Sequence, residues 1–156
     1  MQRGRRGGSI PNVARDSDIL NVLRSTLHER QEILDAYVFG SVARGDSTDH
    51  SDIDVAVYVE DRELRSREGF GYQAELTTDL MKALARNDVD VVVLNNAPPL
   101  LYHRVLRDGV RIVARDLRAT TTREGRALSR YCDYAVQLRK IDDALRARIE
   151  RGEFGK

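Results

Sequence analysis

Two aspartates separated by a single residue are the first feature of the sequence that could carry out chemistry. Asp52 and Asp54 lie at the start of an apolar run, residues 53–59. Strand side chains alternate between faces, so both carboxylates project from one face while Ile53 and Val55 point toward a core. Neighbouring carboxylates repel each other unless a cation lies between them, and their oxygens suit Mg²⁺ or Mn²⁺. The pattern indicates a metal site, with a solvated strand end as the alternative.

A glycine and a serine interrupt the preceding strand-like run, residues 33–39. Glycine lets the backbone approach a ligand closely, and exposed N–H groups and the Ser41 hydroxyl can donate hydrogen bonds to phosphate oxygens. Gly40-Ser41 alone would indicate only a turn. Ten residues separate it from the aspartate pair, and this combination instead favours a phosphate-binding turn.

A third carboxylate is expected from the valine-rich run at residues 89–94. Asp90 lies inside this run, where an ionised carboxylate would lose its hydration unless it were paired or ligated. We therefore expect Asp90 to be buried and to need a cation. Asp88 is the alternative, although it precedes the β-branched run and fits a flanking or capping position better.

Three aspartates beside a phosphate-binding turn are typical of two-metal phosphoryl transfer. One ion would neutralise the triphosphate and the leaving group, and the other would activate the attacking hydroxyl, with the ions about 3.5–4 Å apart. Asp52 and Asp54 would serve both ions. Asp90 would hold the ion that activates the hydroxyl and could accept its proton.

These residues must be positioned by alternating strands and helices. Hydrophobic spacing predicts strands at 33–39, 53–59, 89–94 and 110–113, and helices that begin after Asp16 or Ser17, around Tyr72, and at Pro98. Thr121 and Glu124 have capping-box spacing and predict a long amphipathic C-terminal helix over about 121–150. The fold class is α+β (mixed α/β), a small mixed β-sheet flanked by helices.

Bulk properties limit the cellular context and the kinds of partner. We expect a flexible basic leader at residues 1–15 and a single domain at 16–156. A formal net charge of +1 gives no broad attraction to nucleic acid, and no apolar run is long enough to span a membrane. The single cysteine, Cys132, cannot form an internal disulfide and is read as structural, which fits a cytoplasmic protein.

The motif resembles the signature of the DNA polymerase β-like nucleotidyltransferase superfamily. Gly40-Ser41, ten intervening residues and Asp52-Ile53-Asp54 carry the resemblance, and Asp90 stands where that superfamily has its third carboxylate. The segments 40–45 (Gly-Ser-Val-Ala-Arg-Gly) and 94–98 (Leu-Asn-Asn-Ala-Pro) are similar to the MNT (minimal nucleotidyltransferase) branch. The likeness covers residues 18–113 and extends more weakly into the C-terminal helix.

The resemblance implies transfer of AMP from ATP to an acceptor hydroxyl, with pyrophosphate released. By the family pattern, Gly40 and Ser41 hold the triphosphate, Arg44 is a phosphate neighbour, and the three aspartates bind Mg²⁺. The best-understood MNT proteins are antitoxins of the MntA type, which form complexes with a helical HEPN ribonuclease toxin and AMPylate one of its tyrosines. The arginine-bearing face of the C-terminal helix either contacts such a partner or covers the sheet.

Two other functions compete with this interpretation. One is adenylylation of a small hydroxylated molecule such as an aminoglycoside, which usually needs an acceptor domain for which this chain is too short. The other is a non-catalytic module that neutralises a partner by binding alone. All three aspartates are present, so no loss of ligands supports the second alternative.

Overall fold

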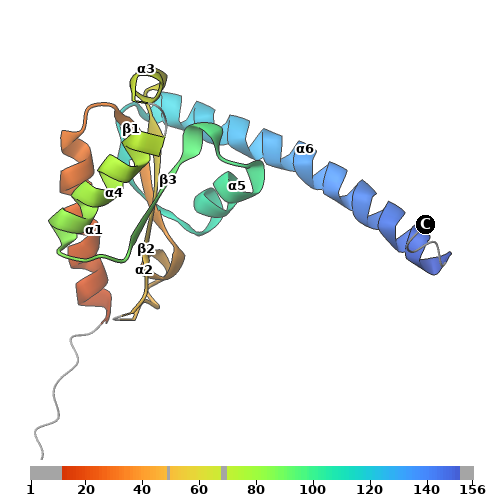
Figure 1. Cartoon of the computed structure of the whole chain (residues 1–156), viewed down its shortest axis with the longest axis horizontal. Coiled ribbons are helices and arrows are strands. Elements are labelled where there is room, and N and C mark those ends of the chain that lie inside the picture. The colour runs from red at the N-terminus through yellow and green to blue at the C-terminus, as the bar shows by residue number, and fades with distance from the viewer. Residues whose placement is uncertain (1–11, 49, 68–69, 152–156) are drawn as a thin grey trace, which may run out of the picture.

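A computed structural model describes residues 12–48, 50–67 and 70–151 of the chain. Helices and strands alternate along it, in agreement with the expected α+β class (Figure 1). The elements are α1 (Asn12–Glu29), β1 (Ile33–Phe39), α2 (Gly40–Arg44), β2 (Ile53–Val59), α3 (Asp61–Ser66), α4 (Phe70–Leu84), β3 (Val89–Val93), the 3-10 turn η1 (Leu94–Asn96), α5 (Pro99–Asp108), β4 (Val110–Ala114) and α6 (Leu117–Glu150).

The four strands form one mixed sheet in the order β3-β2-β1-β4. β1 is antiparallel to both β2 and β4, while β2 and β3 are parallel. β3 is therefore an edge strand, and β2 lies between it and β1. This order places the start of β2 and the start of β3 at the same end of the sheet, next to the end of β1.

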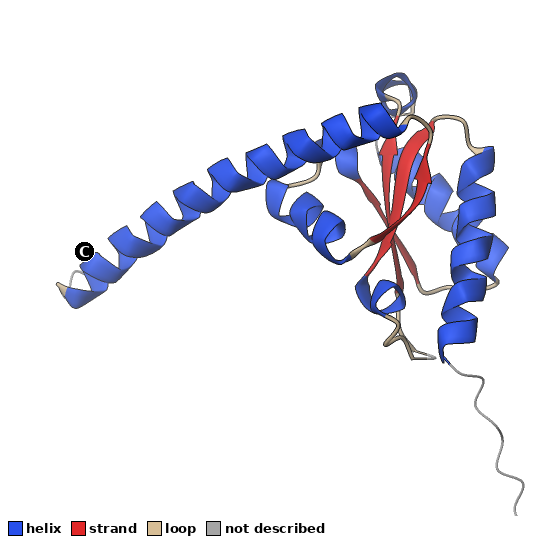
Figure 2. Ribbon diagram, turned by 180° about the vertical axis from the view of Figure 1, so that it is seen from behind, coloured by secondary structure: helices blue, strands red, loops and turns tan. Residues whose placement is uncertain are grey.

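Helices cover both faces of the sheet (Figure 2). On one face, α1 and α4 pack against the strands through a large apolar core that includes Leu23, Leu27, Leu76 and Leu80. On the other face, α5 and the beginning of α6 enclose a smaller core around Tyr37, Ala56, Tyr102, Val105 and Ala127. The sheet is thus the central layer of three.

The strand β2 shows the predicted alternation. Ile53, Val55 and Val57 are fully buried on the α1/α4 side. Asp54 and Tyr58 are half-buried and belong to the opposite side. The face that carries Asp54 is therefore the one that α5 and α6 cover only in part.

The first helix begins earlier than expected. α1 starts at Asn12, so Asp16 and Ser17 lie within the helix instead of capping it, and residues 12–15 of the predicted leader belong to this helix. Asp16 is buried and accepts a hydrogen bond from the Ser47 hydroxyl, which ties the loop before β2 to α1. Residues 1–11 of the predicted leader lie outside the described residues.

The start of the last helix also differs from the prediction. α6 begins at Leu117, and the Asp116 carboxylate caps it by accepting from the backbone N–H groups of Arg118 and Ala119 at 2.9 and 3.0 Å. The Thr121 hydroxyl instead donates to the Leu117 carbonyl inside the first turns. Asp116 can cap the helix because it lies just before Leu117, two residues after the end of β4.

Most of α6 projects beyond the sheet (Figure 2). Only Thr120 and Ala127 are buried in it, while apolar side chains from Leu128 to Ile149 are exposed. The expectation that this helix could cover the sheet holds only for its beginning. Among the described residues, no helix combines the length and apolar character needed to cross a membrane.

Candidate active site

The sheet register brings two of the predicted aspartates together. Asp54 of β2 is paired in register with Asp90 of β3, and on its other side with Phe39, the last residue of β1. Asp52 is exposed immediately before β2. Since Gly40 follows Phe39, the predicted phosphate-binding turn lies directly beside the carboxylates.

Gly40 is in close contact with Asp54. Its φ of +71° is in the left-handed region, and a Cβ at this position would lie 2.1 Å from Asp54 Oδ2. Only glycine combines this backbone conformation with this approach. The glycine of the motif therefore makes room for a carboxylate as well as a turn.

Asp54 is the electrostatic centre of the site. Burial raises the pKa of its carboxyl above the usual value, the negative charges of Asp90 and Asp52 raise it further, and Arg44 lowers it. Arg44 itself is exposed and forms an ion pair with Asp46 at 3.2 Å. The four charged groups thus interact across one small region of the sheet edge.

The position of Asp90 differs from the expectation in one respect. Its side chain is exposed, because at the sheet edge it projects from the face that α5 and α6 cover only in part, so the argument that burial forces it to bind a cation is wrong. Asp88 is engaged elsewhere: Arg86 donates hydrogen bonds to both of its carboxylate oxygens and holds the pKa of the Asp88 carboxyl below its usual value. The geometry therefore favours Asp90 over Asp88 as the third carboxylate.

The carboxylates have the chemistry of cation ligands, although their side chains are not gathered into a metal-binding cluster. Within residues 12–48, 50–67 and 70–151, no group of three or more His, Cys, Asp or Glu side chains is gathered as a metal-binding cluster. The oxygen-only donor set and the mutual repulsion at Asp54 nevertheless suit a hard divalent ion. Asp52, Asp54 and Asp90 are the residues that could hold it.

Four further side chains occupy different environments. Ser41 follows Gly40 in the first turn of α2 and is half-buried, so it belongs to the turn beside the carboxylates, whereas His50 is exposed in the loop before β2. Tyr131 of α6 stacks on His103 of α5 with ring centroids 3.7 Å apart, so it packs between the two helices. Cys132 is a free, exposed cysteine on α6.

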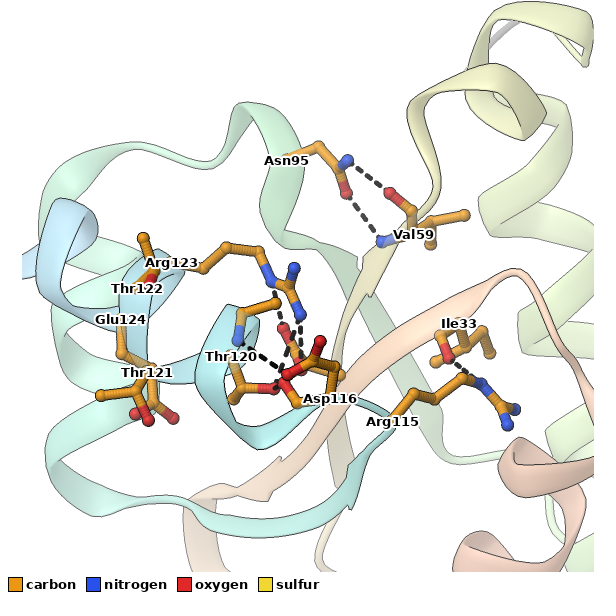
Figure 3. Close-up of polar contacts among 12 residues, drawn as sticks. Ile33, Val59, Asn95, Arg115, Asp116, Thr120, Thr121, Thr122, Arg123 and Glu124 are labelled. Atoms are coloured by element: carbon orange, nitrogen blue, oxygen red, sulfur yellow. Dashed lines mark hydrogen bonds and ion pairs between the residues drawn. The ribbon is translucent and has the colours of Figure 1, made fainter.

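Sequence reasoning missed a buried polar network that fastens α6 to β1 (Figure 3). Asp35 is fully buried and accepts from the Thr120 hydroxyl and from two nitrogens of Arg123, at 2.6 and 3.0 Å. The Arg123 guanidinium also lies over the Tyr58 ring, 5.0 Å from its centroid. An aspartate within the apolar run of residues 33–39 was the available signal.

Comparison with known proteins agrees with this geometry. Residues 21–118 match the family described as "Polymerase beta, Nucleotidyltransferase". The sequence has no significant match among curated proteins.

Solved structures of toxin–antitoxin pairs share the fold. A chain of a toxin–antitoxin crystal structure with AMP-PNP is 25% identical, with a TM-score of 0.68 over 81% of this chain and 97% of the other. A chain of a mutant MntA–HpeT toxin–antitoxin structure is 27% identical, with a TM-score of 0.63 over 83% and 96%. A chain from a Shewanella oneidensis complex of a tri-AMPylated HEPN toxin with an MNT antitoxin is 23% identical, with a TM-score of 0.60 over 86% and 98%, and shows the fold alone.

Proposed function

The chain belongs to the polymerase beta nucleotidyltransferase family, and on that premise we propose that it transfers AMP from ATP to a hydroxyl acceptor and releases pyrophosphate. The observation that carries the proposal is the contact between Gly40 and Asp54, in register with Asp90. A left-handed glycine with no room for a Cβ joins the phosphate-binding turn to the carboxylates.

Each residue of the site has a role that its position supports. Gly40 and Ser41 would present backbone N–H groups and a hydroxyl to the triphosphate, and the exposed Arg44 would add positive charge. Asp52, Asp54 and Asp90 would hold Mg²⁺, with two ions expected and Mn²⁺ as a possible substitute. When bound, the metal would neutralise the triphosphate and lower the pKa of the acceptor hydroxyl.

The exposure of Asp90 suits it to the acceptor side of the site. Asp54 is enclosed by Gly40 and by the neighbouring strands, whereas Asp90 faces solvent at the sheet edge. Its exposure would leave Asp90 accessible to an incoming hydroxyl. Asp90 would therefore orient the hydroxyl and accept its proton.

The acceptor that we propose is a tyrosine of a cognate HEPN-type toxin, held in a hetero-oligomeric complex. Two of the similar structures, including the one with AMP-PNP, contain toxin–antitoxin pairs at 25–27% identity to this chain. AMP on a tyrosine adds bulk and negative charge where RNA phosphates must approach, so it would block a ribonuclease by sterics and repulsion. The projecting part of α6 offers surface outside the metal site for such a partner.

Co-expression with the cognate toxin tests the proposal. The wild-type chain should rescue growth and increase the toxin's mass by one or more AMP units, whereas Asp52→Ala with Asp54→Ala should do neither. Asp18→Ala with Glu29→Ala, which removes two exposed carboxylates from α1, is the matched control and should behave as wild type. Rescue by the Asp52/Asp54 double variant without a mass change would establish neutralisation by contact instead.

Metal dependence has its own measurement. Calorimetry should show that ATP binds in Mg²⁺ but not in chelator, because a triphosphate would otherwise meet three carboxylates. Equal affinity in both conditions would exclude the proposed site.

A further inference from the structure

A second polar cavity lies on the α5/α6 face, away from the three aspartates. It has a volume of about 190 Å³ and is lined by side chains of β2, η1, α5 and α6. Tyr58, one of the lining residues, follows Asp54 by four positions in β2, which corresponds to about 13 Å along the strand. The cavity is therefore distinct from the candidate active site, although both belong to the same face of the sheet.

One of the residues that line the cavity has a buried hydroxyl with no hydrogen-bond partner. Tyr102 of α5 lines it and is only 2% exposed, and its hydroxyl contacts no donor or acceptor among the described residues. Burial raises the pKa of Tyr102 to about 12, and the nearby Asp35 raises it too, so the hydroxyl keeps its proton. Buried polar groups are normally paired, so this O–H is a donor without an acceptor.

Arginines on one side of α6 make the cavity positively charged. Arg123, Arg126 and Arg130 follow one another at three- and four-residue steps and so share a helix face, with the small Ala127 between them. Asp35 neutralises Arg123. Neither of the other two arginines has a carboxylate partner among the described residues, and no acidic side chain lines the cavity.

We propose that this cavity binds a phosphoryl group, as inorganic phosphate or as the phosphate of a small nucleotide. Guanidinium groups are hydrogen-bond donors only, and the phenol O–H groups can donate as well, which suits an anion with several acceptor oxygens. The volume exceeds that of a water, about 30 Å³, and falls below the roughly 300 Å³ at which pockets for larger ligands begin. The anion would join α6 to α5 and β2, and this site does not depend on the proposed AMP transfer.

Phosphate binding can be measured with the whole chain in phosphate-free buffer containing a metal chelator. Titration calorimetry with inorganic phosphate should give saturable binding, and phosphate should raise Tm with dose. Arg126→Gln with Arg130→Gln should weaken Kd by at least about tenfold, because charge-assisted hydrogen bonds are lost. The matched control, Arg139→Gln with Arg148→Gln farther along α6, should keep the wild-type Kd.

The tyrosine and the ligand source each need a separate measurement. Tyr102→Phe should leave Tm without phosphate unchanged or higher, because it deletes an unpaired hydroxyl, yet it should weaken phosphate binding. Equal Kd values for AMP and phosphate would identify phosphate alone as the recognised group, and tighter AMP binding that the Arg126/Arg130 variant abolishes would identify a nucleotide. The proposal is overturned if binding is not saturable, if both arginine pairs weaken it equally, or if glutamate competes as well as phosphate.

Discussion

Adding a single methyl group at Gly40 should disable the active site. In Gly40→Ala the new Cβ would lie 2.1 Å from Asp54 Oδ2, whereas contacts under 3.0 Å force a shift. Asp54 must therefore move by about 0.9 Å. Misplacing a reacting group by about 1 Å can cost about 10²-fold in rate, so we expect a loss of that order in AMP transfer.

Gly45 provides a matched control for the backbone cost. It also has a left-handed φ, +75°, but a Cβ there would meet nothing within 4 Å. Each substitution costs about 1–2 kcal/mol for placing an L-residue in this conformation. Gly40→Ala should add about 1–3 kcal/mol for overpacking, so the two variants should differ by that amount in the free energy of unfolding.

Urea unfolding and transfer kinetics on both variants separate the two effects. Gly45→Ala should lose stability but retain transfer close to wild type, while Gly40→Ala should lose both. Calorimetry should also show weaker Mg-ATP binding in Gly40→Ala. If the two variants lose transfer equally, the contact between Gly40 and Asp54 has no role in function and the reasoning from it fails.

Three further substitutions test individual aspartates. Burial and neighbouring charges raise the pKa of Asp54, so its ionised form destabilises the folded state. Metal-free Asp54→Asn should therefore be more stable than wild type at pH values above the usual carboxyl pKa. Urea unfolding across pH should show that this difference in the free energy of unfolding disappears in acid. Asp35→Asn should destabilise by about 3–5 kcal/mol in urea because Arg123 loses its buried partner, and a cost below about 1 kcal/mol would contradict the assigned pairing. Asp90→Asn should retain Mg-ATP binding in calorimetry but fail in transfer, and the opposite pattern, with loss only in Asp88→Asn, would reassign the third carboxylate.

The parts of the fold that depend on local pattern were predictable from the sequence. β1 and β2 have the expected bounds, because apolar alternation defines them and Gly40 ends the first. The helix predicted around Tyr72 is α4, in which Tyr72, Leu76 and Leu80 are fully buried. Local spacing was sufficient wherever a single face of an element packs on the core.

Helix starts were less predictable because several residues can cap. Asp116 and Thr121 are both good N-cap residues, and the position at which β4 ends determines that α6 begins after Asp116. Asp16 has the same chemistry, yet a tertiary hydrogen bond with Ser47 places it inside α1. Such choices depend on contacts between residues far apart in the chain.

The burial of a strand aspartate was predicted for the wrong residue. The desolvation argument applied to Asp90 describes Asp35, which is buried in the inner strand β1 and paired with Arg123. Asp90 is exposed because, in the edge strand β3, it projects from the face that α5 and α6 cover only in part. A hydrophobic pattern identifies a strand but not its position in the sheet. The sequence therefore shows an aspartate in each strand but not which of the two is buried.

The length of α6 implies a gradient of local stability along one helix. Its 34 residues span about 51 Å, and its buried residues, Thr120 and Ala127, both lie near its beginning. Isolated helices shorter than about 12–15 residues are marginal in water, so residues 136–150 should open without global unfolding. Amide hydrogens there should exchange with solvent far faster than those near Thr120. A partner that covers the exposed apolar side chains would slow exchange first in this distal segment.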